Sequence, residues 1–112
     1  MYNKYSNKKV ILDNIKFDSK AERNRYMELK ILEEAGLIKE LELQKEFELQ
    51  PRFKKNGKTY RKITYKADFY YFDNHLNRYV VEDVKGFKTE VYKLKKKLFE
   101  YVYPDLELLE VK

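Results

Sequence analysis

The chain has 112 residues, of which 43% are hydrophobic, a length and composition that suit one folded domain with one modest core. It has no cysteine and a single histidine, which excludes disulfides, cysteine-based zinc sites and any chemistry that needs two imidazoles. The formal net charge of +6 favours a polyanionic partner, most often nucleic acid. We therefore expect a single domain over residues 1–112.

The N-terminal stretch, residues 1–9, is polar and lacks the apolar core of a signal peptide. We expect it to form a flexible arm or an arm that touches DNA. No stretch of the chain approaches the ~18 apolar residues of a membrane span, so a cytoplasmic protein is expected. Residues 9–17, KVILDNIKF, predict a short hairpin with Asp13 and Asn14 at its turn.

A first helix is predicted over residues 17–36, FDSKAERNRYMELKILEEAG. Asp18 or Ser19 can cap its start, and Gly36 is placed to end it with a left-handed C-cap. The apolar stripe of this helix consists of Tyr26, Leu29 and Leu32. One face of the helix should therefore pack on a sheet.

Three strands should follow. From Ile38 to Gln50 apolar and polar residues alternate, which predicts a half-buried strand that Pro51 stops. The apolar members of that strand are Leu41, Leu43, Phe47 and Leu49. An Asn-Gly turn in KKNGK leads to a long second strand over residues 59–72, and the loop DNHLN leads to a third over residues 78–86. These short connections predict an antiparallel meander.

A second helix is predicted over residues 87–103, FKTEVYKLKKKLFEYVY, and Pro104 ends it. We expect its inward face to carry Val91, Leu94, Leu98 and Val102. Residues 106–111 form a last strand that arrives through this helical crossover and should pair in parallel. The predicted fold is α/β with a mixed sheet of the α+β kind: helix, three strands, helix, strand, after an N-terminal β-hairpin.

Two acids face each other in the predicted hairpin between Tyr60 and Gly86. A four-residue loop, Asn74 to Asn77, makes paired positions sum to 151, so Asp68 lies opposite Asp83 on one face. Lys85, two residues beyond Asp83, lies on that same face. Glu82 points to the other face, so we expect it to be a structural or supporting acid.

Opposed carboxylates destabilise a sheet unless something positive lies between them. Mg²⁺ suits this role, because it prefers oxygen ligands and commonly uses one or two carboxylates. Asp68, Asp83 and the backbone carbonyl of Val84 are the candidate ligands, and Lys85 could orient a water or neutralise a phosphate. The alternatives are a surface acid at Asp68 and a cross-strand salt-bridge patch at residues 82–85.

Glu22 has two interpretations. The run Ser19 to Glu22 fits a capping box, in which Glu22 occupies the third helical position. Glu22 also leads the stripe of Tyr26, and a carboxylate on a buried stripe needs a partner. The proposed metal site would supply one, and both roles could hold if Asp18 is the true cap.

The elements now in place resemble the PD-(D/E)XK nuclease superfamily. The resemblance covers residues 17–111 and rests on Glu22, Asp68 and the run Asp83-Val84-Lys85, in the order helix, strand, strand. Stretches such as YKADFYYF and VVEDVKGFKT look like a group of small phage and prophage proteins placed in that superfamily. Ala67 stands where the superfamily motif has proline.

The resemblance implies a restriction-endonuclease-like core and four catalytic positions. Glu22 corresponds to the first-helix acid, Asp68 and Asp83 to the metal-binding acids, and Lys85 to the catalytic lysine. It implies a Mg²⁺-dependent endodeoxyribonuclease of the Holliday-junction-resolvase or transposon-end-nuclease kind, with Mn²⁺ able to substitute. Glu22 would bind a second metal or orient a water.

DNA contacts are expected mainly on the second helix. The residues expected to hold the DNA backbone are Arg61, Lys88, Lys93, Lys96 and Lys97. A run such as KLKKK is otherwise most often a solvated helix face. Because backbone contacts carry no sequence information, we expect structure-selective or weakly specific cutting, and a paired double-strand cut would require a homodimer. The alternatives are a DNA-binding module that does not cut and a nuclease subunit that needs a partner protein.

Overall fold

The computed structural model describes residues 10–85 and 88–112. The expected flexible arm at residues 1–9 and the expected strand end at Gly86 lie outside these residues. The elements, in chain order, are β1 (Val10–Leu12), β2 (Ile15–Phe17), α1 (Lys20–Glu34), β3 (Ile38–Gln50), β4 (Phe53–Lys55), β5 (Lys58–Tyr60), β6 (Ile63–Asp73), β7 (Arg78–Val84), α2 (Glu90–Val102) and β8 (Leu108–Val111). Neither helix among them has the length and apolarity that crossing a membrane would require.

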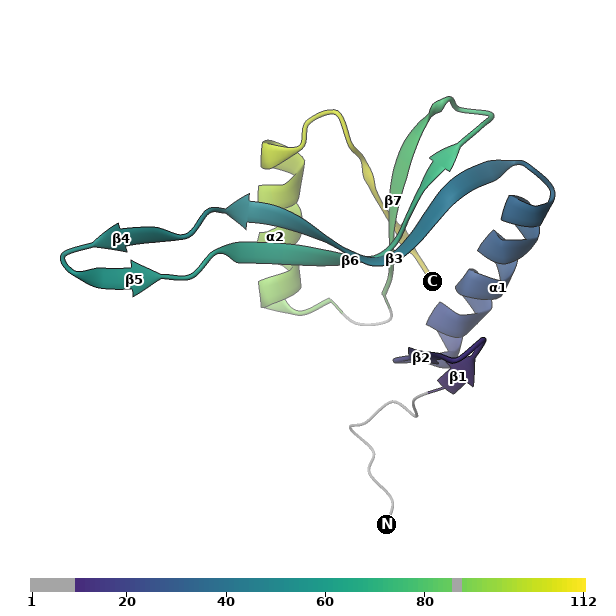
Figure 1. The fold of residues 1–112 in the computed structure, drawn as a ribbon, viewed down its shortest axis with the longest axis horizontal. Helices are drawn as coiled ribbons and strands as arrows, with labels where there is room; N and C mark the ends of the chain where they lie inside the picture. The colour runs from purple at the N-terminus through teal and green to yellow at the C-terminus, as the bar shows by residue number, and fades with distance from the viewer. Residues whose placement is uncertain (1–9, 86–87) are drawn as a thin grey trace, which may run out of the picture.

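A four-stranded mixed sheet forms the centre of the fold, with strand order β3-β6-β7-β8 (Figure 1). The first three strands are antiparallel, and β8 returns through α2 to pair in parallel with β7. The predicted α+β class, element order and N-terminal hairpin are all confirmed. β1 and β2 form that hairpin, and Asp13 and Asn14 have the left-handed φ values of 54° and 63° expected at its turn.

Helix α1 has the predicted ends. Ser19 is the N-cap, and its side chain accepts a hydrogen bond from the backbone N–H of Glu22. At the other end Gly36 has φ +78°, its N–H donates to Glu33, and the N–H of Leu37 donates to Leu32. This pair of bonds is a Schellman motif, which glycine allows because it has no Cβ to clash in the left-handed conformation.

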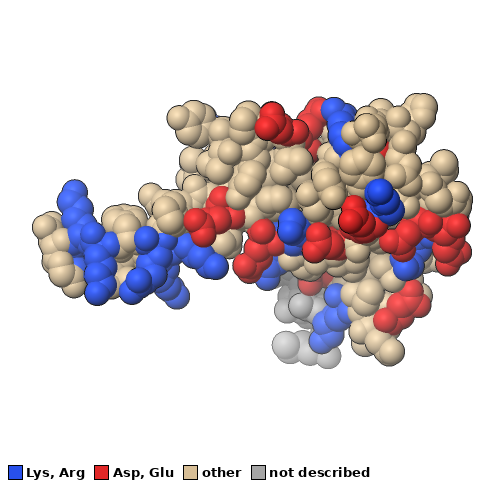
Figure 2. All heavy atoms as spheres, turned by 45° about the horizontal axis from the view of Figure 1, so that its top comes forward, with Lys and Arg blue, Asp and Glu red and all other residues tan. Residues whose placement is uncertain are grey.

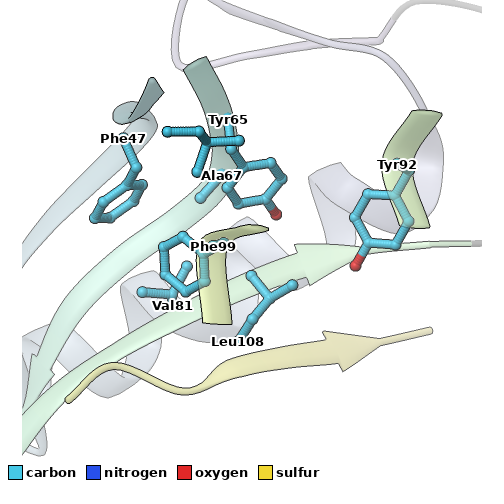
Figure 3. Close-up of a cluster of buried hydrophobic side chains, with 8 residues drawn as sticks. Phe47, Tyr65, Ala67, Val81, Tyr92, Phe99 and Leu108 are labelled. Carbon is cyan, nitrogen blue, oxygen red and sulfur yellow. The ribbon is translucent and has the colours of Figure 1, made fainter. Parts of the chain in front are cut away.

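The two helices pack on opposite faces of the sheet. Consecutive side chains of β7 therefore contact one helical side and the other in turn. Val81 belongs to a cluster that includes Phe47, Tyr65 and Phe99 of α2 (Figure 3). Val80 belongs to a second cluster, whose other buried members are Phe17, Tyr26, Leu29, Ile38, Phe69 and Tyr71. We call them the α2 core and the α1 core.

Strands β3 and β6 exchange faces at one point. Leu43 packs in the α1 core and Phe47 in the α2 core, although regular alternation would put both on one face. Ala67 and Phe69 are only two residues apart, yet Ala67 packs in the α2 core and Phe69 in the α1 core. The pairs Leu43↔Phe69 and Lys45↔Ala67 flank the exchange, which therefore lies at Gln44 and Asp68. Gln44 has φ +56°, and this left-handed residue interrupts the regular pleat.

The same exchange corrects the prediction for β3. Its bounds, Ile38 to Gln50, are as predicted. Its apolar residues, however, do not form one face: Leu41 and Leu43 contact the α1 core, whereas Phe47 and Leu49 are buried in the α2 core. A period of two in the sequence cannot reveal a residue that reverses the pleat.

The long second strand predicted over residues 59–72 is divided. β6 begins at Ile63, and the turn at Asn56 and Gly57 belongs to a separate hairpin of β4 and β5. This hairpin projects from the sheet beyond the ends of β3 and β6 (Figure 1). Every residue from Pro51 to Ile63 is exposed. We call residues 52–62 the β4–β5 arm.

The inward face predicted for α2 is wrong. Val91, Leu94 and Val102 are 64%, 59% and 40% exposed, and only Leu98 of that set packs against the α2 core. The buried residues are Tyr92 and Phe99, supported by Tyr103. The aromatic rings fill the space between helix and sheet, where Phe99 lies 5.1 Å from the ring of Phe47 and 5.6 Å from that of Tyr65. The packing of these aromatic rings therefore decides which face of α2 meets the sheet, and most of the aliphatic stripe stays exposed.

Candidate active site

Asp68 and Asp83 come together as the register predicts. The pairs from Phe69↔Glu82 to Asp73↔Arg78 all sum to 151, so the next step places Asp68 opposite Asp83. The Asp68 carboxylate is turned across to β7, where its Oδ2 accepts a 2.8 Å hydrogen bond from the N–H of Val84. Asp68 thus lies on the neighbouring strand in contact with the run that contains Asp83.

Asp83 is 1% exposed, and its two oxygens have different surroundings. Oδ2 accepts a hydrogen bond from the hydroxyl of Tyr65. Oδ1 lies 3.0 Å from the ammonium of Lys85, but it accepts no hydrogen bond of regular geometry from the described residues. The ion pair with Lys85 is therefore the interaction that stabilises this buried oxygen among the described residues.

Lys85 is held by contacts on two sides. Its ammonium forms the ion pair with Asp83 and lies 4.4 Å from the centre of the Tyr92 ring. Tyr92 is fixed in turn, because its hydroxyl donates a 2.8 Å hydrogen bond to Glu110 on β8. Lys85 and Val84 also line a cavity of about 270 Å³, together with Ala21 and Lys112. The lysine therefore lies between the carboxylates and open space.

Glu22 contributes its backbone to the cap of α1 and its side chain to a contact with β3. Its backbone N–H donates to the side chain of Ser19, the N-cap, while its own side chain is 7% exposed and its Oε1 accepts a 3.3 Å hydrogen bond from the amide of Gln44. The N-cap is therefore Ser19 and not Asp18, and the metal-binding role of the Glu22 carboxylate stays a prediction. The Gln44 amide also donates a 3.3 Å bond to Asp68 Oδ1 and so bridges the two acids.

Burial and mutual repulsion set the protonation of this cluster. Burial, and then the charge of Asp68, raise the pKa of Glu22 to about 7. Burial, and then the charge of Asp83, raise the pKa of Asp68 to about 6, against a smaller opposing effect of the Val84 N–H. Two acids with pKa values near neutrality mark a site where a cation would be stabilised.

The acids do not form a closed metal cluster as they stand. Over residues 10–85 and 88–112, no three or more Asp, Glu, His or Cys side chains converge closely enough to hold an ion together. Asp68 and Asp83 lie side by side, and Glu22 is connected to them through Gln44. The roles of Glu22, Asp68, Asp83, Val84 and Lys85 remain predictions. Two adjacent carboxylates nevertheless match what Mg²⁺ commonly takes from proteins.

Glu82 points to the α1 face, as predicted, and is 1% exposed. Its carboxylate accepts two 2.7 Å hydrogen bonds from Arg25 of α1 and one from the hydroxyl of Tyr71. It is therefore a structural acid that joins α1 to β7. Because Arg25 lies one turn after Glu22, this ion pair also sets where Glu22 meets the sheet.

The residues expected to bind DNA are all at the surface but differ in their contacts. Lys88 and Lys96 both reach Glu110, at 3.1 Å and 3.2 Å, and Lys93 pairs with Glu90 at 3.3 Å. The hydrogen bond from the Tyr92 hydroxyl, followed by those from Lys88 and Lys96, lowers the pKa of Glu110 to about 2. Lys97 and Arg61 are exposed, and Arg61 belongs to the β4–β5 arm.

Sequence reasoning missed three residues of the site: Gln44, Tyr65 and Tyr92. Tyr65 and Tyr92 belong to no motif in the sequence, and only the packing brings the Tyr65 hydroxyl to Asp83 and the Tyr92 ring to Lys85. In Figure 3 Tyr92 lies at the margin of the α2 core. Gln44 could have been noticed as a polar residue flanked by the apolar positions of β3, but its left-handed φ has no signal in the sequence.

Glu22, Asp68 and Asp83 thus come from a helix and two adjacent strands of one mixed sheet. The chain belongs to the family described as Protein of unknown function (DUF1064), whose model matches residues 2–112. None of the curated proteins and none of the solved structures matches the chain.

Proposed function

We propose that the protein is a Mg²⁺-dependent endodeoxyribonuclease. The observation that carries the proposal is the Asp83 carboxylate, which is 1% exposed and lies beside Asp68 and 3.0 Å from the ammonium of Lys85. Lys85 and Tyr65 stabilise this buried charge, and a cation between Asp68 and Asp83 would offset the repulsion between the two carboxylates. The mixed sheet, the acid positions and the resemblance to the PD-(D/E)XK superfamily support the same reading.

The donor set suits a hard divalent cation. Asp68, Asp83 and the backbone carbonyl of Val84 would hold Mg²⁺, with Mn²⁺ able to substitute, and Glu22 would reach it through water or hold a second ion. When bound, the cation supplies Lewis-acid polarisation of a phosphoryl oxygen and lowers the pKa of a water. The absence of thiol and paired imidazole ligands fits such an oxygen-based site.

The protein's own residues account for the remaining steps. Lys85 is fixed by Asp83 and the Tyr92 ring, so its ammonium can donate to a phosphate oxygen or orient the attacking water. Glu22, with a pKa raised to about 7, can accept a proton at neutral pH. Tyr65 keeps Asp83 in one orientation by donating to Oδ2.

The substrate we propose is DNA whose backbone geometry, rather than base sequence, selects the cutting position. The net charge of +6 supports a polyanionic substrate, and the surface lysines offer contacts to phosphates, which position without reading sequence. A phage or prophage enzyme of the junction-resolving or transposon-end kind fits this description. A paired double-strand cut would need two such sites, and therefore a homodimer.

The test is an Asp83→Asn variant assayed beside wild type on branched and linear DNA, with Mg²⁺ or Mn²⁺ and with chelator. Asp105→Asn is the matched control, because Asp105 is an exposed acid far along the chain from the site. Wild type and the control should cut, and Asp83→Asn should lose cutting by at least ~10³-fold while its DNA affinity stays within a few fold.

Each other outcome rejects part of the proposal. If wild type binds DNA and never cuts, even after addition of neighbouring proteins from its own genome, the protein is a binding module. If cutting appears only with such an addition, it is a subunit of a larger nuclease. If Asp83→Asn cuts as fast as Asp105→Asn, the active site is misplaced.

A further inference from the structure

The β4–β5 arm is the most strongly charged feature of the described surface. It carries six cations and no acid over residues 52–62, namely Arg52, Lys54, Lys55, Lys58, Arg61 and Lys62. Figure 2 shows these blue side chains gathered on a projection, whereas acidic and basic side chains alternate over the body of the molecule. None of the ion pairs between described residues involves a cation of the arm.

The arm is nevertheless an ordered hairpin. Asn56 and Gly57 have φ of 52° and 74°, the type I′ geometry that an Asn-Gly turn favours. Near its base the rings of Phe53 and Tyr60 stack at 4.8 Å with an interplanar angle of 8°. This stack stabilises the hairpin outside any core, so the arm presents its charges in a fixed arrangement.

The register places like charges together at the tip. Lys55 pairs directly with Lys58, on the same face as the Phe53 and Tyr60 rings, and Lys54 pairs with Thr59 on the other face. Directly opposed lysines repel each other and destabilise a hairpin in isolation. An anion between them would remove that cost, and regularly spaced phosphates would suit several lysines at once.

We propose that the β4–β5 arm is a second DNA-binding element, which holds duplex backbone away from the catalytic residues. A two-stranded β-ribbon has the width that the major groove admits, and its edges would then face the phosphates on both sides. The occupant is nucleic acid rather than a second copy of the chain, because another copy carries the same excess of positive charge. The arm extends the proposed nuclease function, but its binding can be measured without cutting.

The length of the chain limits how far the arm reaches. Ten residues separate Asp68 of the site from Lys58 at the tip, and at ~3.3 Å per residue they span at most about 33 Å. This length corresponds to about one turn of B-DNA, or roughly 10 base pairs. The arm should therefore protect backbone up to one helical turn from the cutting position, on one side only.

The experiment measures affinity for a 30-base-pair duplex without divalent metal, between 50 and 200 mM salt. The arm variant is Lys54→Gln, Lys55→Gln, Lys58→Gln, which keeps the turn and the ring stack. The matched control is Lys30→Gln, Lys39→Gln, Arg78→Gln, which removes the same charge from α1 and from the ends of β3 and β7 that lie away from the arm. A third variant replaces residues 51–62 with Asn-Gly, which joins the paired residues Gln50 and Ile63 by a two-residue turn.

The arm variant should bind at least ~10-fold more weakly than the control at 50 mM salt. The affinity of wild type should fall roughly 40-fold more than that of the arm variant between 50 and 200 mM, as expected for three lost phosphate contacts. Hydroxyl-radical footprints on a four-way junction, whose branch point fixes the position of the protein, should lose one protected region about 10 base pairs from that point. The third variant should behave like the arm variant.

The inference is overturned if the arm and control variants bind equally, in which case the lysines serve only to prevent edge-to-edge pairing. It is also overturned if wild type does not bind duplex DNA at 50 mM salt. A change from dimer to monomer in the arm variant, with unchanged DNA affinity per protomer, would identify the arm as a contact between copies. If wild type binds duplex DNA through the arm but does not cut it, only the nuclease proposal is rejected. If wild type cuts DNA and the arm variant binds as tightly as the control, only the proposal for the arm is rejected.

Discussion

Arg25 of α1 and Glu82 of β7 form a bidentate ion pair, in which the guanidinium Nε and Nη2 each donate a 2.7 Å hydrogen bond to one carboxylate oxygen. Their positions are 57 residues apart in the chain. The bond to Glu82 is the main cause of a raised pKa at Arg25. This pair joins the first helix to the strand that carries Asp83, so the distance between Glu22 and Asp83 depends on it.

Removal of Arg25 should therefore destabilise the fold strongly. Arg25→Gln leaves a buried carboxylate with only the Tyr71 hydroxyl, and we expect a loss of about 3–5 kcal/mol in the free energy of unfolding by urea. Glu28→Gln, which removes the exposed partner at 3.8 Å, should cost less than about 1 kcal/mol. An Arg25→Met, Glu82→Leu double variant should recover most of the loss. Equal effects of the Arg25 and Glu28 variants would contradict a structural role for the pair.

Tyr65→Phe should weaken metal binding while the fold is kept. Tyr65 donates to Asp83 Oδ2 and is 3% exposed, so its hydroxyl fixes the carboxylate without touching an ion. We expect the affinity for Mn²⁺ to fall roughly 10- to 100-fold, the range typical when a group that orients a metal ligand is lost. Titration followed by electron paramagnetic resonance measures this. Tyr103→Phe, which loses a bond to the Glu48 carbonyl, is the control and should leave Mn²⁺ affinity unchanged.

The Tyr92 ring should matter for rate more than for metal affinity. Tyr92→Leu removes the face that lies 4.4 Å from the Lys85 ammonium, an interaction of about 0.5–2 kcal/mol. If Lys85 acts in the reaction, kcat should fall by roughly 2- to 30-fold with Mn²⁺ affinity unchanged. Tyr92→Phe keeps the ring and should lose less. An equal loss in the phenylalanine and leucine variants would instead assign the effect to the bond with Glu110, which both variants lack.

Metal-free protein should lose stability as the pH rises from 4.5 to 7.5. The pKa values of Glu22 and Asp68 are raised from 4.5 and 3.8 to about 7 and 6, so the folded state binds more protons than the unfolded state in this window. Their contribution is complete below the unfolded pKa values and is lost as the pH passes the folded ones. The lowered pKa of Glu110 acts mainly below this window, as the pH falls from its unfolded value of 4.5 toward about 2.

Thermal unfolding in chelator measures this effect. The Tm of wild type should fall across the window relative to that of a Glu22→Gln, Asp68→Asn variant, which cannot titrate at these positions. Mg²⁺ should raise the wild-type Tm at pH 7.5, since an ion that binds only the folded state stabilises it. A double variant with the same pH dependence as wild type would show that other groups cause the loss.

The arrangement of strands could be predicted because local signals and global topology agree. The Asn-Gly and Asp-Asn turns, the cap at Ser19 and the left-handed Gly36 all lie where short motifs place them. The loop of residues 74–77 then fixed the register that sets Asp68 opposite Asp83. Strand register depends on loop length and pleat, both of which are visible in the sequence.

Side-chain packing could not be predicted to the same depth. The aliphatic stripe of α2 has a regular helical spacing, yet Val91 and Leu94 stay exposed because Tyr92 and Phe99 fill the space more completely. The bridge that Gln44 makes between Glu22 and Asp68 could not be predicted, because it depends on one left-handed φ. Both failures concern competition between similar local patterns, which only tertiary contacts decide.

The face exchange at Gln44 and Asp68 has a mechanical consequence. The carboxylates lie where the two cores meet across the sheet, since Glu22 is on α1 and Asp83 accepts a hydrogen bond from Tyr65 of the α2 core. Because β7 supplies Val80 to one core and Val81 to the other, a shift in the packing of either core would move the acids relative to each other. Substitutions deep in the α1 core, such as Leu29→Ala, could therefore change the spacing of the acids from a distance.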